Sequence, residues 1–267
     1  MEPQSPSGLP ATSSIPEGAT APPPGGWTVA SGHGATWWRE GWRLFAAFPV
    51  VWIAMTVLFV VLMFVLALVP ILGHVASTVL YPVLVGGLLV GARAVDRGEA
   101  LTFNHLFACF DQRLGPLVIA GLLYIAGWFV IWLVAIAICI ALFGFDSIAA
   151  LMATDPTQGD FSGLATFGMA VFVALLVVLV LGTPLIMAYW FAPALIALRG
   201  DRPVAAMKAS FSASLRNVSP LLIYSLLGML FGLLATLPFG LGWFVLAPVF
   251  LASVYVSYRD IFAADRK

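Results

Sequence analysis

The chain has 267 residues, of which 62% are hydrophobic and only 9% are charged, and its mean hydropathy is +1.05. Soluble domains carry about 25% charged residues, so this composition excludes an ordinary water-exposed surface and indicates a protein that folds in a lipid bilayer. Lys plus Arg and Asp plus Glu number 12 each, which leaves no net charge to attract nucleic acid. We therefore expect the bilayer as a partner and no nucleic acid.

Residues 1–35 are rich in Pro, Gly, Ser, Thr and Ala. Such a segment buries too little apolar surface to offset the entropy lost when it becomes ordered, so we expect a disordered tail. No apolar core with a basic flank precedes the first long apolar run, and we expect no cleaved signal peptide. The transmembrane domain is expected over residues 36–262, followed by a short charged tail over 263–267.

Six apolar runs are long enough to cross about 30 Å of hydrocarbon, which takes about 20 helical residues. Helices satisfy their own backbone polar groups in lipid, so the sequence predicts an all-α polytopic membrane protein. The predicted spans are Pro49–Val69, Val75–Val95, Pro116–Leu142, Leu164–Leu198, Pro220–Leu237 and Trp243–Tyr258. The third and fourth exceed the length that a span needs, and we expect them to tilt or to extend past the interface.

With these six spans, all 12 Lys and Arg residues fall on one side of the membrane. The charged residues of the longest connection on the other side are all acidic, namely Asp146, Asp155 and Asp160. Cytoplasmic connections are enriched in Lys and Arg. The pattern therefore predicts a multi-pass membrane protein with both termini in the cytoplasm.

The three predicted hairpins share a pattern. Each is preceded by a segment that mixes apolar and polar residues and ends at a proline, and these segments read WWREGWRLFAAFP (37–49), LTFNHLFACFDQRLGP (101–116) and RPVAAMKASFSASLRNVSP (202–220). Apolar residues at helical spacing predict helices that lie on the cytoplasmic leaflet. Pro82 and Arg93 are separated by eleven residues, as are Pro248 and Arg259. We predict three parallel repeats, each an interfacial helix followed by two spans.

Two sets of residues are candidates for binding and packing. Basic residues near the membrane surface attract anionic headgroups by about 1 kcal/mol each, which makes Lys208, Arg216, Arg113 and Arg43 candidate contacts for headgroups or for an unidentified membrane or cytoplasmic protein. The alternative is that these charges only fix the topology. Two pairs of glycines spaced four residues apart predict close helix packing, namely Gly87 with Gly91 and Gly228 with Gly232.

The sequence contains no recognisable catalytic or metal-binding pattern. The predicted spans contain no Asp, Glu or Lys, and their one Arg, Arg93, lies at the cytoplasmic end of the second span. HExxH, P-loop and GxSxG patterns are absent. His33, His74 and His105 do not share one side of the membrane, so they cannot form a three-histidine site. Cys109 and Cys139 are expected to pack as small apolar residues rather than to form a disulfide. We expect no cofactor and no enzyme activity.

The segments WWREGWRLFAAFP, GARAVDRGEALTFNHLFACF and RPVAAMKASFSASLRN resemble those of uncharacterised bacterial inner-membrane proteins with six spans. The sequence is also distantly similar to the membrane domain that accompanies some glycerophosphodiester phosphodiesterases. The resemblance covers residues 37–262. It implies an all-helical inner-membrane fold without catalytic residues, because the acidic metal site of those phosphodiesterases would lie in a separate soluble domain.

Three functions follow from these patterns as hypotheses. The first is a non-enzymatic accessory, scaffold or lipid-organising protein that acts through its cytoplasmic helices and its helix packing. The second is a permease or channel-like protein for an apolar or lipid-like solute, which needs no buried charge. The third, an intramembrane enzyme, is disfavoured because acid, base and metal constellations are missing.

Overall fold

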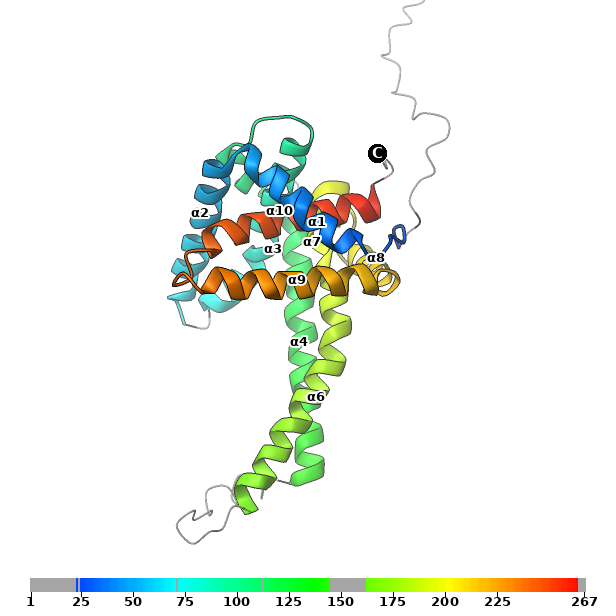
Figure 1. Ribbon diagram of the computed structural model, residues 1–267. Helices are drawn as coiled ribbons and strands as arrows, with labels where there is room; N and C mark the ends of the chain where they lie inside the picture. Colours follow the sequence, from blue (N-terminus) through cyan, green and yellow to red (C-terminus); the bar gives the residue numbers. More distant parts are fainter. Residues whose placement is uncertain (1–22, 24, 71, 112, 145–161, 264–267) are drawn as a thin grey trace, which may run out of the picture.

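The computed structural model describes residues 23, 25–70, 72–111, 113–144 and 162–263, and every regular element within them is helical (Figure 1). In chain order the elements are α1 (His33–Ala47), α2 (Pro49–Ala67), α3 (Leu72–Asp96), η1 (Phe103–Phe107), α4 (Leu114–Phe143), α6 (Ser162–Trp190), α7 (Ala192–Ala194), η3 (Leu195–Arg199), α8 (Pro203–Arg216), α9 (Val218–Thr236) and α10 (Trp243–Phe262). The short η1 is a 3₁₀ helix and η3 is a π-helical turn.

The described residues contain six helices that are long and apolar enough to cross a membrane. They match the six predicted spans to within a few residues at each end, which confirms the all-helical class and the number of candidate spans. The fourth covers Gly163–Arg199 but is interrupted after Trp190. Pro193 has no N–H to continue the helix, and the N–H of Phe191 donates instead to Ser210 Oγ at 2.9 Å.

The second helix of each hairpin supplies most of the core. Among the six candidate spans, α3 and α10 are the most buried, and α7 with η3 is buried between them and α8. Leu88, Phe191, Leu195 and Ala252 are fully buried and belong to one apolar cluster. By contrast, α4 and α6 extend side by side far beyond the other helices and expose most of their apolar side chains (Figure 1).

The segments between the hairpins follow one packing scheme. η1 packs on α3 and α8 packs on α6, so each segment contacts the second helix of the hairpin before it. α1 precedes the first hairpin and packs on α10, the second helix of the last hairpin. The α1–α10 contact is close, because a Cβ at Gly41 would lie 2.8 Å from the backbone nitrogen of Ser253. The first helix of the chain, α1, therefore packs on the last helix, α10.

The predicted interfacial helices differ from the observed segments. Among the described residues from 101 to 113, η1 is the only regular element, with Leu106 buried against α3 and Phe103 exposed. α8 buries its small residues Ala206, Ser210, Ala213 and Ser214, whereas the apolar residues Val204 and Leu215 are exposed. α1 packs mainly on α10 and α9, and its side chains Trp37, Trp38, Leu44 and Phe45 are buried. Much of the surface expected to contact lipid therefore packs on neighbouring helices.

The ordered part of the chain begins before residue 36. Residues 1–22 and 24, most of the predicted disordered tail, lie outside the described residues, as do residues 264–267 and the acidic residues of the connection at 145–161. Within the described part, however, Val29 is buried and its N–H donates to Asn217 Oδ1 at 2.9 Å. The prediction of disorder up to residue 35 is therefore wrong for residues 25–35.

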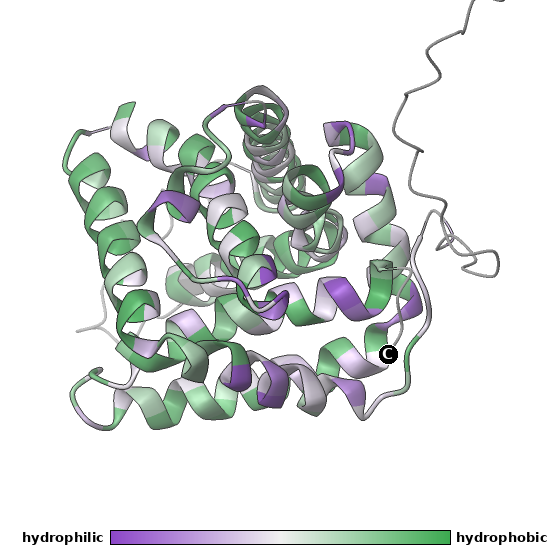
Figure 2. Cartoon of the chain, turned by 90° about the horizontal axis from the view of Figure 1, so that it is seen from above, coloured by the Kyte–Doolittle hydropathy of each residue, from purple (hydrophilic) through white to green (hydrophobic). Residues whose placement is uncertain are grey.

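The three hairpins α2–α3, α4–α6 and α9–α10 diverge from a common base. In Figure 1, α9 and α10 run across the direction of α4 and α6, and Figure 2, seen from above, shows α4 and α6 nearly end-on. Figure 2 also shows hydrophobic residues over most of the helical surface. The hairpins therefore leave the base in different directions, and the threefold repeat stays a prediction at this level.

We predict that Gly41→Ala destabilises the fold, because the added Cβ would overlap the backbone of Ser253. Overpacking of this kind costs about 1–3 kcal/mol, so the melting temperature in detergent should fall. Gly168→Ala is the matched control, since nothing lies within 4 Å of a Cβ at that helical position and alanine favours a helix over glycine. Equal melting temperatures for the two variants would contradict the close α1–α10 contact.

Candidate functional site: the charged end of the bundle

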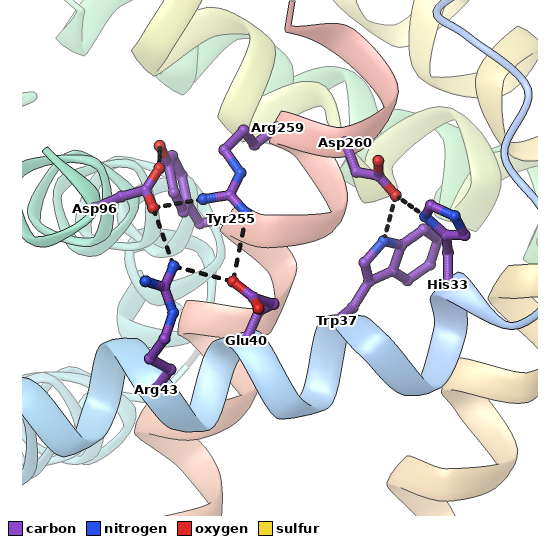
Figure 3. Close-up of polar contacts among 8 residues, drawn as sticks. All are labelled: His33, Trp37, Glu40, Arg43, Asp96, Tyr255, Arg259 and Asp260. Carbon is purple, nitrogen blue, oxygen red and sulfur yellow. Dashed lines mark hydrogen bonds and ion pairs between the residues drawn. The ribbon is translucent and has the colours of Figure 1, made fainter. Parts of the chain in front are cut away.

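The charged end is the part of the molecule where α3, η3 and α10 end and where α1, the 97–113 connector and α8 pack on them. One polar network there joins α1, α3 and α10 (Figure 3). Asp96 accepts a hydrogen bond from Tyr255 Oη at 3.0 Å and forms a close ion pair with Arg259. Arg43 lies 2.9 Å from Glu40 and 3.7 Å from Asp96. The network ties the first helix of the chain to the second helices of the first and last hairpins.

A second polar contact joins the start of α1 to the end of α10 (Figure 3). Asp260 Oδ2 lies 2.7 Å from His33 Nδ1 and accepts a hydrogen bond from Trp37 Nε1 at 2.9 Å. Trp37 is fully buried, so its indole N–H needs this partner. The two networks together fix α1 along the whole polar end of α10.

An arginine near the end of each second helix reaches the end of another second helix. Arg93 of α3 donates to the carbonyl of Leu198 at 3.1 Å. Arg199 binds Asp201 through its Nε at 2.9 Å, and its guanidinium lies 5.6 Å from the centre of the Phe262 ring on α10. Arg259 of α10 binds Asp96 of α3, and this contact joins the third hairpin to the first. We call these three contacts the arginine ring.

Residues 25–32, just before α1, form a strap over α8 and α10. The N–H of Trp27 donates to the carbonyl of Ile261 at 2.8 Å, and Asn217 Nδ2 donates to the carbonyl of Trp27 at 3.0 Å. Asn217 is fully buried and binds the strap on both its amide atoms. The strap holds Gly25 against Ser212, with no room for a side chain between them.

A cleft of about 500 Å³ lies beside this strap and is lined by Gly25, Arg199, Asp201, Arg202, Ala205, Lys208, Ala209 and Ser212. Arg199 is neutralised by Asp201. Arg202 and Lys208 are exposed and form no ion pair or hydrogen bond within the part of the chain that the structure describes. The cleft therefore offers two cations to an anionic group.

The structure separates the four basic residues that the sequence put forward as candidate contacts. Lys208 lines the cleft, and Arg216 lies on the same helix beside Gly25. Arg43 belongs to the network with Glu40 and Asp96, although 63% of its side chain is exposed. Arg113 packs its guanidinium against Gly200, whose φ of +82° and lack of a side chain allow this approach.

The four candidate packing glycines have different neighbours from those expected. A Cβ at Gly87 would lie 2.2 Å from the carbonyl oxygen of Leu106, and one at Gly91 would lie 2.8 Å from the Leu101 side chain, so both face the 97–113 connector rather than another long helix. A Cβ at Gly228 would lie 3.0 Å from the Trp38 ring of α1, whereas one at Gly232 would make only ordinary contacts with Trp243.

Sequence reasoning missed the acidic partners of the charged end. Glu40, Asp96 and Asp260 each lie close in sequence to a basic residue, and for Asp96 and Asp260 that residue is in the last turn of a helix, which was the available signal. It did not identify the pairs, because Asp96 and Arg259 are 163 residues apart.

The charged end contains no metal-binding cluster or reactive thiol among the residues described. Within them, no group of three or more His, Cys, Asp or Glu side chains is placed to hold a metal ion. Cys109 is buried in the 97–113 connector, and this burial raises the pKa of its thiol to about 11, although Arg113 and Arg93 oppose the shift. A thiol with that pKa is almost fully protonated at neutral pH and therefore a poor nucleophile.

The chain is similar to one curated protein, a probable inner membrane protein of Burkholderia thailandensis. The two sequences are 26% identical over 257 residues, which cover 89% of this chain and 93% of the relative. No family model matches the chain, and no solved structure matches it. With six candidate spans in the described residues, the chain is a multi-pass membrane protein.

We predict that Arg259→Gln lowers the stability of the protein in detergent, because Asp96 has only 15% of its side chain exposed and would lose its closest cation. Leaving a buried polar group short of a partner costs about 1–3 kcal/mol. Arg97→Gln removes the same charge from an exposed position one residue after α3 and should leave the melting temperature unchanged. If both variants melt like the parent, the network does not hold α10 to α3.

Proposed function

We propose that the chain is an integral protein of the bacterial inner membrane that acts as a non-enzymatic scaffold and organises the lipids around it. The observation that carries this proposal is the contrast between the closely packed charged end and the three apolar hairpins that diverge from it. The curated relative, described as a probable inner membrane protein, supports the location. The distant resemblance to a membrane domain accompanying phosphodiesterases is compatible with an accessory role and stays a prediction.

The proposed orientation places the charged end and both termini in the cytoplasm. The contacts of Arg43, Arg93, Arg199 and Arg259 gather basic residues from all three hairpins at one end of the molecule. Enrichment of Lys and Arg on the cytoplasmic side is the main determinant of membrane orientation. The tips of the hairpins then lie on the periplasmic side.

We also propose that the three hairpins are copies of one unit arranged about a common axis. Two features support this arrangement. Each segment before a hairpin packs on the second helix of the preceding hairpin, and α1 completes the cycle on α10. The arginine ring follows the hairpins in the same cyclic order, from α3 to η3, from η3 to α10 and from α10 to α3.

The lengths of the hairpins connect this arrangement to lipid organisation. α9 has 19 residues and is about 28 Å long, which barely matches about 30 Å of hydrocarbon. α4 has 30 residues and is about 45 Å long. Diverging hairpins must tilt, and a tilted short helix spans less than the full hydrocarbon thickness. Thinning of the surrounding bilayer relieves such a mismatch, so this protein would select and order the lipids in contact with it.

A permease for an apolar or lipid-like solute is the second candidate. It is favoured by an apolar groove between α1, α9 and α10, described below. The core argues for the scaffold instead, because Leu88, Phe191 and Ala252 fill the space where the second helices meet. In proteoliposomes, a permease for lipids would exchange a reporter lipid between the leaflets, whereas a scaffold leaves it in its original leaflet.

We predict that Arg202→Gln combined with Lys208→Gln weakens retention of anionic lipid, since the two free cations of the cleft are lost. At about 1 kcal/mol per basic residue, retention of phosphatidylglycerol in native mass spectrometry should fall by at least tenfold. Arg97→Gln combined with Arg216→Gln is the matched control, because it removes two basic residues that do not line the cleft. An equal fall in the control would show that general positive charge, rather than the cleft, retains the lipid.

A further inference from the structure

A second hollow on the surface, separate from the cleft, has a different chemical character. It is a groove of about 720 Å³ between α1, α9 and α10, within the range of about 300–1,000 Å³ that is typical of small-molecule sites. It is lined by Ala35, Trp38, Arg39, Trp42, Leu227, Phe231, Leu234, Ala235, Gly242, Val245, Leu246 and Val249. Arg39 is the only charged residue in this lining, and every other lining side chain is apolar or aromatic.

The groove is built from one stripe of each helix. The lining residues of α1 recur at helical spacing, as do those of α9, so each helix turns a continuous stripe toward the same hollow. Trp38 forms the floor, because its indole N–H donates to the carbonyl of Tyr224 at 3.0 Å and its ring stacks on the Tyr224 ring at 5.0 Å. The floor of the groove is therefore fixed by buried contacts.

The polar groups of the groove lie at its α1 rim. Arg39 is exposed and forms no ion pair or hydrogen bond with any residue in the described ranges. The neighbouring charges of α1 differ in this respect, since Glu40 and Arg43 are paired with each other and with α3 and α10. Trp42 also lies at the rim with half of its side chain exposed. The rim thus combines a free guanidinium with an indole above an apolar hollow.

We propose that this groove binds one anionic phospholipid, with an acyl chain along α9 and α10 and the headgroup phosphate on Arg39. A guanidinium binds phosphate through two parallel N–H groups, and tryptophan favours the boundary between apolar and aqueous regions. Charge complementarity selects this occupant over a neutral lipid, because Arg39 is the one charge in the lining and its side chain has no partner among the described residues. The proposal rests on the proposed function as a lipid-organising protein and assigns it a specific site.

The test is native mass spectrometry of the full chain with equal amounts of phosphatidylglycerol and phosphatidylcholine. Arg39→Gln should reduce retention of phosphatidylglycerol about fivefold, as expected for the loss of one basic residue at an anionic surface, and Arg39→Lys should restore part of it. Leu234→Trp should also reduce retention by filling the groove. Leu233→Trp is its matched control, because Leu233 directly precedes Leu234 in α9, is exposed and does not line the groove. The melting temperature of each variant verifies that it is folded.

The possible results separate this proposal from the proposed function. If Arg39→Gln and Leu234→Trp retain phosphatidylglycerol like the parent while Arg202→Gln with Lys208→Gln does not, the groove is not the site but lipid binding at the charged end stands. If no variant changes retention, both proposals fail. Equal retention of the two lipids by the parent would also overturn the groove as an anionic site. A change in oligomeric state with Leu234→Trp, without a change in lipid, would show that a second copy of the chain occupies the groove.

Discussion

Three arginines at the ends of apolar helices impose the main constraint on this protein. Each follows a long stretch without charge, at the depth where a helix leaves hydrocarbon, and a guanidinium there must find an acceptor or reach water. Arg93 and Arg259 find their acceptors at the end of another hairpin's second helix. Arg199 pairs with Asp201, close to it in the chain, and its guanidinium also contacts the Phe262 ring of α10. Because each contact requires the next helix end to be in place, the second helices converge at one end of the molecule.

This convergence decides what the rest of the chain does. The second helices are joined at their charged ends, so their apolar ends are free to diverge, and α4 and α6 leave the base almost without neighbours (Figure 1). α1, η1 and α8 cover the outside of the converging ends and bury small or aromatic residues there. The result is a polar end from which apolar hairpins extend, and the helices α2, α4, α6 and α9 expose many of their apolar side chains. Lipid contact is therefore the property most directly connected to this architecture.

The sequence was informative where a structural feature is local. Runs such as Pro49–Val69 predicted the spans because length and hydropathy act on each helix separately. It was less informative where a partner is distant. The amphipathic stripe of α1 shows that one face is apolar, but lipid and α10 satisfy that face equally well, and only the fold decides between them. The strap was missed for a similar reason, since Val29 and Trp27 are held by Asn217, which follows about 190 residues later.

The segment between residues 101 and 114 shows a further limit of periodicity. Its aromatic residues have helical spacing, yet the close approach of Leu106 to Gly87 places this segment on α3 as a short 3₁₀ turn capped by Thr102 and His105. The candidate site divides in the same way. Lys208 was predicted as a surface cation and lines the cleft. No sequence pattern distinguished Arg39 from the other basic residues, because its position in the groove depends on how α1 is rotated against α9 and α10.

Membrane-impermeant maleimide labelling of intact spheroplasts tests whether the hairpins cross the membrane and whether the charged end lies in the cytoplasm. With Cys109→Ala and Cys139→Ala as the background, single cysteines would be introduced as Phe239→Cys, at the fully exposed α9–α10 tip, and as Glu99→Cys, in the exposed connector after α3. We expect labelling of Phe239→Cys before lysis and of Glu99→Cys only after lysis. Labelling of both cysteines before lysis, or of neither, would contradict this expectation.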